Sequence, residues 1–245
     1  MATKKKNRII AFPLYDGVTL TDFTGPTEVF SFTNGFTPIW MATEKRFITT
    51  SEGAHVFPHY AFHEKHPPID ILFVPGGGAP GVIKGGMFDK AFQDFLRKTA
   101  ITAQWTGSVC TGAFILAAAG LLNDCTVTTY WNVIDDLALL KDKFNLRFPE
   151  DKYVRGVIDS RRKRFTGGGI SSSIDLALML VEKLVNKKAA ERAQLYIQYA
   201  PQPPVHAGDP TQAPAALLKQ VRKEQKAYNQ LYAAAVKKLL KTNKP

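Results

Sequence analysis

Short apolar runs alternate along the chain with segments in which apolar residues recur at helical spacing. Strand-like runs lie at residues 8–12, 40–42, 69–74 and 103–109, and helical segments lie at 26–32, 88–98 and 111–119. This alternation is typical of a mostly parallel sheet that is covered by helices on both faces. The first half of the chain therefore predicts an α/β fold.

The second half continues the pattern and adds a hairpin. A strand at 126–129, a helix at 131–140, a hairpin-like pair at 153–158 and 163–166 and a long amphipathic helix at 172–185 follow in turn. Sites in such sheets gather at the carboxyl ends of strands. Three glycine-rich segments fall at such ends, namely 75–78, 107–112 and 166–169, and none has Walker A or GxGxxG spacing, so phosphate binding is weakly supported.

Cys110 stands where the strand at 103–109 meets the helix at 111–119. At such an elbow the side chain is pushed above the sheet edge, and the first free N–H groups of the helix favour negative charge on sulfur. We therefore expect a raised thiolate fraction at neutral pH. The same N–H groups can stabilise an anion on a substrate, so the turn is predicted to be a nucleophile elbow with half of an oxyanion hole.

A second interpretation makes Cys110 a small core residue, because free cysteine is among the most buried residue types. Gly107 and Gly112 flank the turn at the places where a sharp bend and close packing call for no side chain. Gly120 is placed to cap the end of the following helix. These glycines favour the nucleophile over the core residue.

Two further segments at strand ends carry candidate chemistry. Gly76 and Gly77 directly follow the strand at 69–74, so their N–H groups are candidates for the second donor of an oxyanion hole, although the segment also suits an ordinary turn. Asp22 ends the first strand-to-helix connection just before Pro26, which suits the first turn of a helix. Its carboxylate is a candidate for proton transfer or for a helix or turn cap.

Histidine is absent from the positions where a cysteine partner is expected. Four histidines share the segment 55–66, and His206 lies in a proline-rich stretch. At the end of the strand 126–129 the residue is Tyr130, whose hydroxyl can donate a hydrogen bond but is a poor general base because its ordinary pKa is near 10. Asp22 is therefore the leading candidate for proton handling.

Length and cysteine content narrow the class of protein. The 245 residues, 45% of them hydrophobic, fit a single domain with a full core. No apolar run is long enough for a membrane span and no signal peptide is recognisable, so we expect a cytoplasmic protein without membrane association. Two cysteines, Cys110 and Cys125, make neither a disulfide framework nor a four-ligand zinc site. Cys125 is predicted to be inert.

The net charge of +11 is concentrated at the two ends of the chain. Residues 1–8 carry four basic side chains, and residues 215–245 carry eight against one acid, Glu224. The rest is balanced, although residues 161–164 form a local basic run. We expect solvated basic tails and no nucleic-acid partner, since no helix-turn-helix or zinc-finger pattern occurs.

The C-terminal part is predicted to be an appendage of the same domain. We divide the chain into a basic tail at 1–8, a catalytic domain at 9–200, and a proline-rich segment with a C-terminal helix at 201–245. The proline-rich residues 200–214 are expected to pack along the body and to line the mouth of a pocket. Residues 215–241 carry apolar positions on one helical stripe, which must be buried against the chain itself or against a second copy.

Together these motifs resemble the ThiJ/PfpI superfamily, which has the class I glutamine amidotransferase-like fold, and within it the isonitrile (isocyanide) hydratases. The resemblance covers nearly the full chain. It rests on the segments 20–26, 75–77, 108–112, 118–122, 166–170 and 199–204, and the tail at 198–214 narrows it to the hydratases. It implies a flavodoxin-like three-layer sandwich with a nucleophile elbow, and a homodimer.

The resemblance also implies roles for particular residues. Cys110 would be the nucleophile, Asp22 the acid/base carboxylate, and Thr111 the neighbour that offers N–H and hydroxyl groups to the sulfur. Relatives commonly have Thr-Thr-His-Trp where this chain has Tyr130, so this residue departs from the pattern at the pocket. The implied reaction is hydration of an isonitrile to an N-substituted formamide through a thioimidate on Cys110, without metal or cofactor.

That chemistry requires Asp22 to be protonated before the substrate reacts, and other functions of the same superfamily remain open. A carboxyl group that begins protonated near neutral pH must be desolvated or beside the thiolate, and the two groups then titrate as a coupled pair. One rival function is a cysteine-based oxidative-stress sensor or a ligand-binding protein of the same superfamily without hydratase activity. Amidase, peptidase or glyoxalase activity is a third, weakened by Tyr130.

Overall fold

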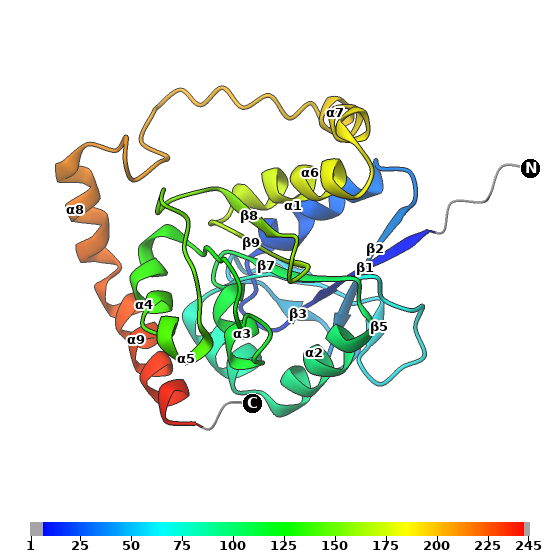
Figure 1. Cartoon of the computed structure of the whole chain (residues 1–245), viewed down its shortest axis with the longest axis horizontal. Helices are drawn as coiled ribbons and strands as arrows, with labels where there is room; N and C mark the ends of the chain where they lie inside the picture. Colours follow the sequence, from blue (N-terminus) through cyan, green and yellow to red (C-terminus); the bar gives the residue numbers. More distant parts are fainter. Residues whose placement is uncertain (1–6, 243–245) are drawn as a thin grey trace, which may run out of the picture.

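A seven-stranded sheet forms the centre of the molecule. The computed structural model describes residues 7–242 (Figure 1). The strands are β1 (Arg8–Pro13), β2 (Phe36–Ala42), β5 (Tyr60–Ala61), β6 (Ile71–Val74), β7 (Trp105–Val109), β8 (Gly156–Asp159) and β9 (Arg164–Gly167). Their order is β5-β2-β1-β6-β7-β9-β8, and every neighbouring pair is parallel except the hairpin of β8 and β9. β3 (Ile48–Thr49) and β4 (His55–Val56) form a separate small hairpin.

Helices cover both faces of this sheet (Figure 1). On one face α1 (Leu20–Ser31), α6 (Ser172–Leu184) and α7 (Lys187–Tyr196) pack together. On the other lie the π-helix η1 (Gly81–Met87), α2 (Lys90–Thr102) and α3 (Gly112–Ala118), and beside them the 3-10 helix η2 (Trp131–Val133), α4 (Ile134–Ala138) and α5 (Lys141–Phe144). The predicted three-layer α/β sandwich is thereby confirmed.

The strands are buried on both sides, as their near-continuous apolar sequence requires. All four residues of β6 and all five of β7 are buried. Phe73 of β6 contacts the rings of Phe12, Phe30 and Phe165, so one aromatic cluster joins three strands and α1 in the core. This packing fixes the carboxyl ends of β1, β6, β7 and β9 side by side.

The first helix begins earlier than predicted. α1 starts at Leu20, so Asp22 lies in its first turn and Pro26 inside the helix. The N-terminus of α1 has no side-chain cap from Thr19; instead the Leu20 N–H donates to the Glu52 carboxylate at 3.0 Å. Because this acceptor comes from a distant loop, the local sequence gives no sign of the true start.

The segment at 126–129 is not a strand of the sheet, contrary to prediction. It makes one isolated bridge, between Thr126 and Arg147. The Thr128 N–H donates to the Thr166 hydroxyl at 2.8 Å, and the Thr129 hydroxyl donates to the Cys110 carbonyl at 2.7 Å. Each of these bonds to β9 or β7 joins a backbone group to a side-chain hydroxyl, so no backbone ladder forms.

The predicted C-terminal helix is two helices, α8 (Ala215–Glu224) and α9 (Lys226–Lys241), that meet at Gln225. α9 packs on α4 and η2 of its own chain, with Tyr232, Val236 and Leu239 buried. α8 buries none of its residues. The chain itself therefore covers part of the apolar stripe along α9, where Leu231 and Leu240 stay exposed, and leaves every apolar position of α8 exposed or half-buried.

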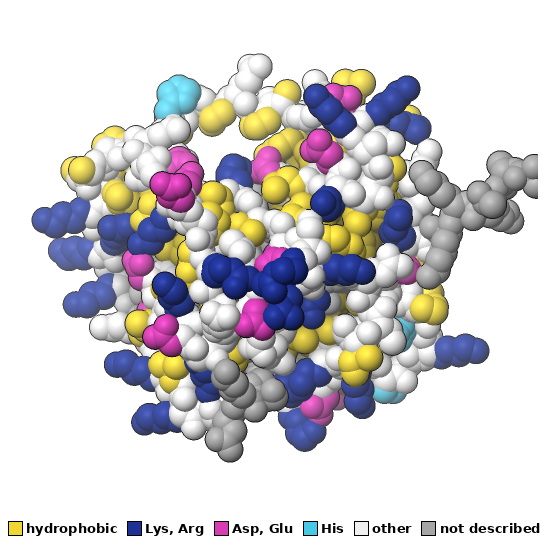
Figure 2. Space-filling model, in the orientation of Figure 1, with side chains coloured by type: hydrophobic (Ala, Val, Ile, Leu, Met, Phe, Trp, Pro, Cys, Tyr) yellow, Lys and Arg dark blue, Asp and Glu magenta, His cyan; other side chains and the backbone are white. Residues whose placement is uncertain are grey.

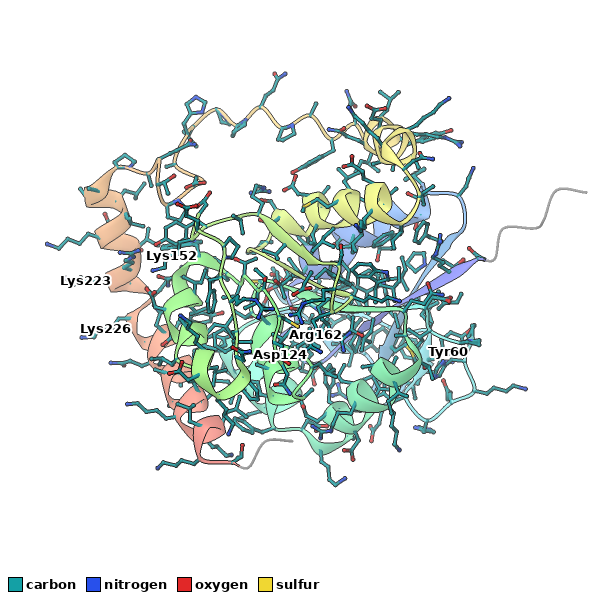
Figure 3. All side chains as sticks on the ribbon, in the orientation of Figure 1. Tyr60, Asp124, Lys152, Arg162, Lys223 and Lys226 are labelled. Atoms are coloured by element: carbon teal, nitrogen blue, oxygen red, sulfur yellow. The ribbon has the colours of Figure 1, made fainter. Side chains whose placement is uncertain are left out.

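Basic side chains are spread over the face in Figure 2, with one group near its centre. In Figure 3 Arg162 lies beside Asp124 at this place, and the two form an ion pair. Arg161 donates to the Asp124 carbonyl at 2.6 Å, so part of the basic run at 161–164 is satisfied within the chain. Lys223 and Lys226 point outward at the corner of α8 and α9 (Figure 3). Residues 1–6 of the predicted basic tail lie outside the described residues, and Arg8 belongs to β1.

Among the helices of residues 7–242, none combines the length and the apolar character that crossing a bilayer requires.

Candidate active site

Cys110 occupies the turn between β7 and α3 in a left-handed backbone conformation, with φ at +54°. Residues other than glycine rarely adopt this region, because it costs of order 1–3 kcal/mol and persists only where the surroundings enforce it. Here they do: the Cys110 N–H lies 3.1 Å from the Gly167 carbonyl and 2.9 Å from that of Gly168, and the Cys110 carbonyl accepts the Thr129 hydroxyl. A strained cysteine held in this way is the predicted elbow.

Glycines allow the chain to close tightly around this elbow. A Cβ atom on Gly107 would lie 2.2 Å from Phe165, and one on Gly112 would lie 2.5 Å from the Val74 carbonyl oxygen. A Cβ atom on Gly76 would lie 2.6 Å from the Thr111 nitrogen and 2.8 Å from the Cys110 Cβ. The turn after β6 therefore rests directly on the cysteine, and the close packing predicted at Gly107 and Gly112 is confirmed.

Asp22 reaches the elbow from the first turn of α1. Its side chain is 0% exposed, and its Oδ2 accepts the Gly76 N–H at 2.9 Å. Its Oδ1 is buried without a hydrogen-bond partner. Asp22 thus caps neither its helix nor a turn. Among the described residues three hydroxyl oxygens share this state, but Oδ1 is the one carboxylate oxygen that does, and such a group needs a water, a ligand or a reaction to account for it.

Burial governs the protonation of both groups. It raises the pKa of Asp22 to about 8, against the Gly76 N–H and an interaction with the Cys110 thiol, which lower it. Burial also raises the pKa of the Cys110 thiol well above its ordinary value, and the Asp22 charge adds to the rise. The raised pKa of Asp22 agrees with the requirement for a carboxyl group that is protonated near neutral pH. The predicted rise in thiolate fraction is wrong, because desolvation outweighs the start of a seven-residue helix.

Thr111 binds the glycine turn through its side chain. Its Oγ1 accepts the Gly77 N–H at 3.0 Å and lies 3.2 Å from the Gly77 carbonyl oxygen, to which its hydroxyl can donate. Its N–H and hydroxyl groups lower the pKa of Cys110, in opposition to burial. The N–H groups of Gly76 and Gly77 are occupied by Asp22 and Thr111, so neither is the free oxyanion donor that the sequence suggests.

Three tyrosines also meet this turn, and sequence reasoning missed them. The Tyr15 hydroxyl donates to the Pro75 carbonyl at 3.1 Å, and the Tyr228 hydroxyl donates to the Gly77 carbonyl at 3.1 Å. The ring of Tyr232 is tilted against that of Phe114, with the centroids 4.7 Å apart, and its hydroxyl lies 3.5 Å from the Gly77 oxygen. The place of Tyr15 just beyond β1 was an available signal. Nothing local connects Tyr228 and Tyr232 of α9 to Cys110.

Tyr130 lies between the elbow and the C-terminal helices. Its ring packs on Gly169, where a Cβ atom would lie 2.2 Å from the ring. The Gln225 side-chain amide donates to its hydroxyl at 3.3 Å. Burial raises the pKa of Tyr130, so the hydroxyl is a neutral donor or acceptor at neutral pH. The structure therefore brings Cys110, Asp22, Thr111, Gly76, Gly77 and Tyr130 together.

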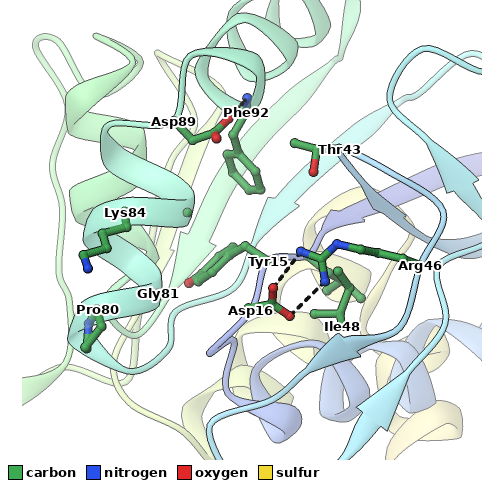
Figure 4. Close-up of a pocket in the computed structure, with 12 residues that line it drawn as sticks. Tyr15, Asp16, Thr43, Arg46, Ile48, Pro80, Gly81, Lys84, Asp89 and Phe92 are labelled. Atoms are coloured by element: carbon green, nitrogen blue, oxygen red, sulfur yellow. Dashed lines mark hydrogen bonds and ion pairs between the residues drawn. The ribbon is translucent and has the colours of Figure 1, made fainter.

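The proline-rich segment lines a cavity, in agreement with its predicted place. This cavity, of about 700 Å³, lies between the segment and the carboxyl end of β9, with Thr129 and Gly168 in its wall. A second cavity, of about 400 Å³, borders Tyr15 on the side of η1 (Figure 4). No cluster of three or more His, Cys, Asp or Glu side chains suited to a metal ion occurs within residues 7–242.

The strained elbow, the buried carboxyl group and the mostly parallel sheet define an α/β protein with a cysteine at a nucleophile elbow. The sequence pattern of the DJ-1/PfpI family matches residues 8–183, and the chain belongs to this family. It is 36% identical over 215 residues to "Isonitrile hydratase" of Pseudomonas putida, with 87% of this chain and 88% of that protein covered.

Solved structures agree with this assignment. A THiJ/PfpI family protein from Pseudomonas syringae superposes with a TM-score of 0.85 at 30% identity, covering 94% of this chain and 90% of that one. Oxidized DJ-1 of Toxoplasma gondii superposes with a TM-score of 0.62 at 21% identity, covering 79% of this chain and all of that one. The second likeness concerns the fold alone.

Proposed function

We propose that this protein is an isonitrile hydratase, which adds water to R–N≡C and releases an N-substituted formamide. The observation that carries the proposal is the buried pair of Cys110 and Asp22, a thiol and a carboxyl group with raised pKa values at a strained elbow. The likeness to the Pseudomonas putida hydratase over most of the chain supports the choice of substrate.

The protonation states suit the first step. At neutral pH Asp22 holds its proton, because its pKa is about 8. In our scheme this proton passes to the terminal carbon of the isonitrile, the carboxylate takes the thiol proton, and sulfur bonds to the carbon. The product is the thioimidate R–N=CH–S–Cys110, and Asp22 is again a carboxylic acid. The thiolate need not exist before the substrate arrives.

Hydrolysis follows with the same carboxyl group. Asp22 gives its proton to the thioimidate nitrogen and accepts a proton from the water that attacks the carbon, which forms R–NH–CH(OH)–S–Cys110. Collapse of this adduct breaks the carbon–sulfur bond, returns a proton to sulfur through Asp22 and releases R–NH–CHO. Each step moves only protons and the C–S and C–O bonds, so the scheme calls for neither metal nor organic cofactor.

The surrounding groups support these two residues. Thr111 offers its N–H and hydroxyl groups to the sulfur, which stabilises negative charge as the C–S bond forms and breaks. The Gly76 N–H holds Asp22 in place, and Tyr130 lies near enough to the thiol for the charge of Cys110 to raise its pKa. Cys110 is only 5% exposed, which suits the slender, rod-like N≡C group better than a bulkier amide.

The oxidative-stress sensor is less well supported by this geometry. Sensor cysteines combine exposure with a low pKa, since the thiolate is the species that oxidises. Cys110 is buried, and its pKa is raised. A neutral thiol beside a protonated carboxyl group favours reaction with a neutral electrophile that must accept a proton as sulfur adds to it.

We also propose a homodimer and a cytoplasmic location for the enzyme. α8 buries none of its residues, and its Leu217 is 41% exposed, so this helix offers apolar surface to a second copy. Sedimentation velocity measures the assembly directly, and a single species with the mass of one chain would contradict the dimer.

The test of function is formamide production from a simple alkyl or aryl isonitrile, followed by NMR. Cys110→Ala is expected to lower turnover by at least about a thousandfold, and Asp22→Asn by about a hundredfold or more. Cys125→Ser is the matched control, because Cys125 is also buried and has a pKa raised to about 11, and it is expected to retain activity. Absence of turnover in the folded wild-type protein would refute the proposal.

A further inference from the structure

A single peptide group links Tyr15 to Asp22. The carbonyl of Pro75 accepts the Tyr15 hydroxyl at 3.1 Å, and the N–H of Gly76 donates to the Asp22 Oδ2 at 2.9 Å. These two atoms belong to one planar unit, because Pro75 and Gly76 share the peptide bond. The hydroxyl and the carboxyl group are therefore bonded to opposite ends of the same dipole.

This arrangement couples the two hydrogen bonds. Rotation of the peptide plane would lengthen both, so the Tyr15 hydroxyl restrains the direction in which the Gly76 N–H points. A hydrogen bond to a carbonyl also polarises its peptide group and makes the N–H a stronger donor. We propose that Tyr15 is a positioning residue for Asp22, whose hydroxyl orients the Pro75–Gly76 peptide and strengthens its N–H bond to the carboxylate.

The ring of Tyr15 is fixed for this task. It is 4% exposed and meets Phe92 edge-on, with the ring centroids 5.5 Å apart. A Cβ atom on Gly85 of η1 would lie 3.2 Å from the Tyr15 Cβ, so η1 packs closely against it. Figure 4 shows Tyr15 between Phe92 and Gly81 in the wall of the smaller cavity. Packing on both sides holds the hydroxyl against Pro75.

The other groups that face Asp22 do not act through the Pro75–Gly76 peptide. They are the Cys110 thiol and the Glu52 carboxylate, which accepts the N–H of Leu20 and the hydroxyl of Ser51. α6 packs on α1 near Gly25 through Ser173 and Ile174, which are uncharged. Burial raises the pKa of Tyr15 well above its ordinary value, so the phenol is neutral while Asp22 titrates. Replacing it by phenylalanine removes a donor and changes no charge.

The test is a titration of Asp22 by carboxyl ¹³C NMR in Tyr15→Phe, with the resonance assigned by its loss in Asp22→Asn. A weaker Gly76 donor stabilises the ionised carboxylate less, so the midpoint is expected to rise by about half a pH unit to one unit. Incorporation of 3-fluorotyrosine at position 15 makes the phenol a stronger donor, and the midpoint is then expected to fall.

Tyr228→Phe is the matched comparison. It removes a tyrosine hydroxyl from the same turn, but that hydroxyl bonds to the Gly77 carbonyl, which belongs to a different peptide group. We expect the Asp22 midpoint to stay within about 0.2 pH unit of the wild-type value, since a shift that small corresponds to little change in carboxylate stabilisation. An unchanged midpoint in Tyr15→Phe, or an equal shift in Tyr228→Phe, would overturn the proposal.

Two features keep this test decisive. If Tyr15→Phe does not fold, the fluorotyrosine protein decides alone: a lower midpoint supports the proposal, and an unchanged or higher midpoint overturns it. The titration needs no substrate, so its outcome is separate from that of the activity assay. Only the expectation that the pH profile of turnover moves together with the Asp22 midpoint rests on the proposed hydratase function.

Discussion

Gly76 is the residue on which the site depends most directly, because the elbow leaves no room for a side chain there. The change Gly76→Ala would place a Cβ atom 2.6 Å from the Thr111 nitrogen. We expect it to destabilise the fold by about 1–3 kcal/mol through overpacking and to displace the N–H from Asp22, with loss of most turnover. Thermal unfolding and formamide production measure the two effects.

Gly78→Ala provides the control for this prediction. Gly78 lies two residues along the same turn, yet the nearest atom to its added Cβ is 3.8 Å away, an ordinary contact. We expect this variant to have the thermal stability and the turnover of the wild type. Equal losses of stability and turnover in the two variants would mean that the turn tolerates alanine nowhere. They would contradict the specific role of Gly76 in the close contact with the elbow.

At the scale of elements, α9 is the part of the structure that ties the end of the chain to the site. Leu239→Ala removes a side chain that is 3% exposed, and Leu231→Ala removes the same side chain from the same helix where it is 46% exposed. We expect costs of about 2–5 kcal/mol for the first and less than about 1 kcal/mol for the second. Denaturant unfolding of both variants measures the difference, and similar values would show that α9 is not packed as described.

Elements whose signals are local could be predicted from the sequence. The strands β6 and β7, the elbow, and the hairpin of β8 and β9 each carry apolar runs or glycines at the place where the chain turns. The start of α1 could not be predicted, because its N–H partner is Glu52. The 126–129 segment was wrongly predicted for a similar reason. Its threonines favour strands, but the Thr128 N–H donates to the Thr166 hydroxyl and the Thr129 hydroxyl donates to the Cys110 carbonyl, so distant partners replace a strand ladder.

Part of the candidate site could likewise be predicted from the sequence, and part of it could not. Cys110, Asp22 and Thr111 stand at strand ends or helix starts, where topology alone brings side chains together. Their electrostatics could not be predicted, because the desolvation that raises the pKa of the thiol comes from the packing of the whole fold. Tyr228 comes from a helix whose docking depends on contacts between α9, α4 and η2 that leave no local pattern.

At the scale of the whole molecule, the raised pKa of Asp22 links global stability to pH. The carboxyl group has a pKa of about 8 in the folded protein and roughly 3.9 in the unfolded chain. Between these values the folded state holds a proton that the unfolded state has released. Stability is therefore greatest at the acid end of this window and falls as the pH rises through it, by about 1.4 kcal/mol per pH unit at most. Above the folded pKa no further loss from Asp22 is expected.

Asp22→Asn isolates this contribution, because asparagine has a similar shape and cannot ionise. The substitution leaves an unpartnered amide where Oδ1 was, with a cost of about 1–3 kcal/mol that does not vary with pH. We expect the melting temperature of the variant, relative to that of the wild type, to rise between pH 5 and about pH 8 and to level off above that value. The exposed Asp142→Asn controls for the loss of one negative charge and should track the wild type. Parallel curves for Asp22→Asn and the wild type would mean that the buried carboxyl group ionises in the ordinary range, and the proton on which the proposed chemistry depends would then be missing at neutral pH.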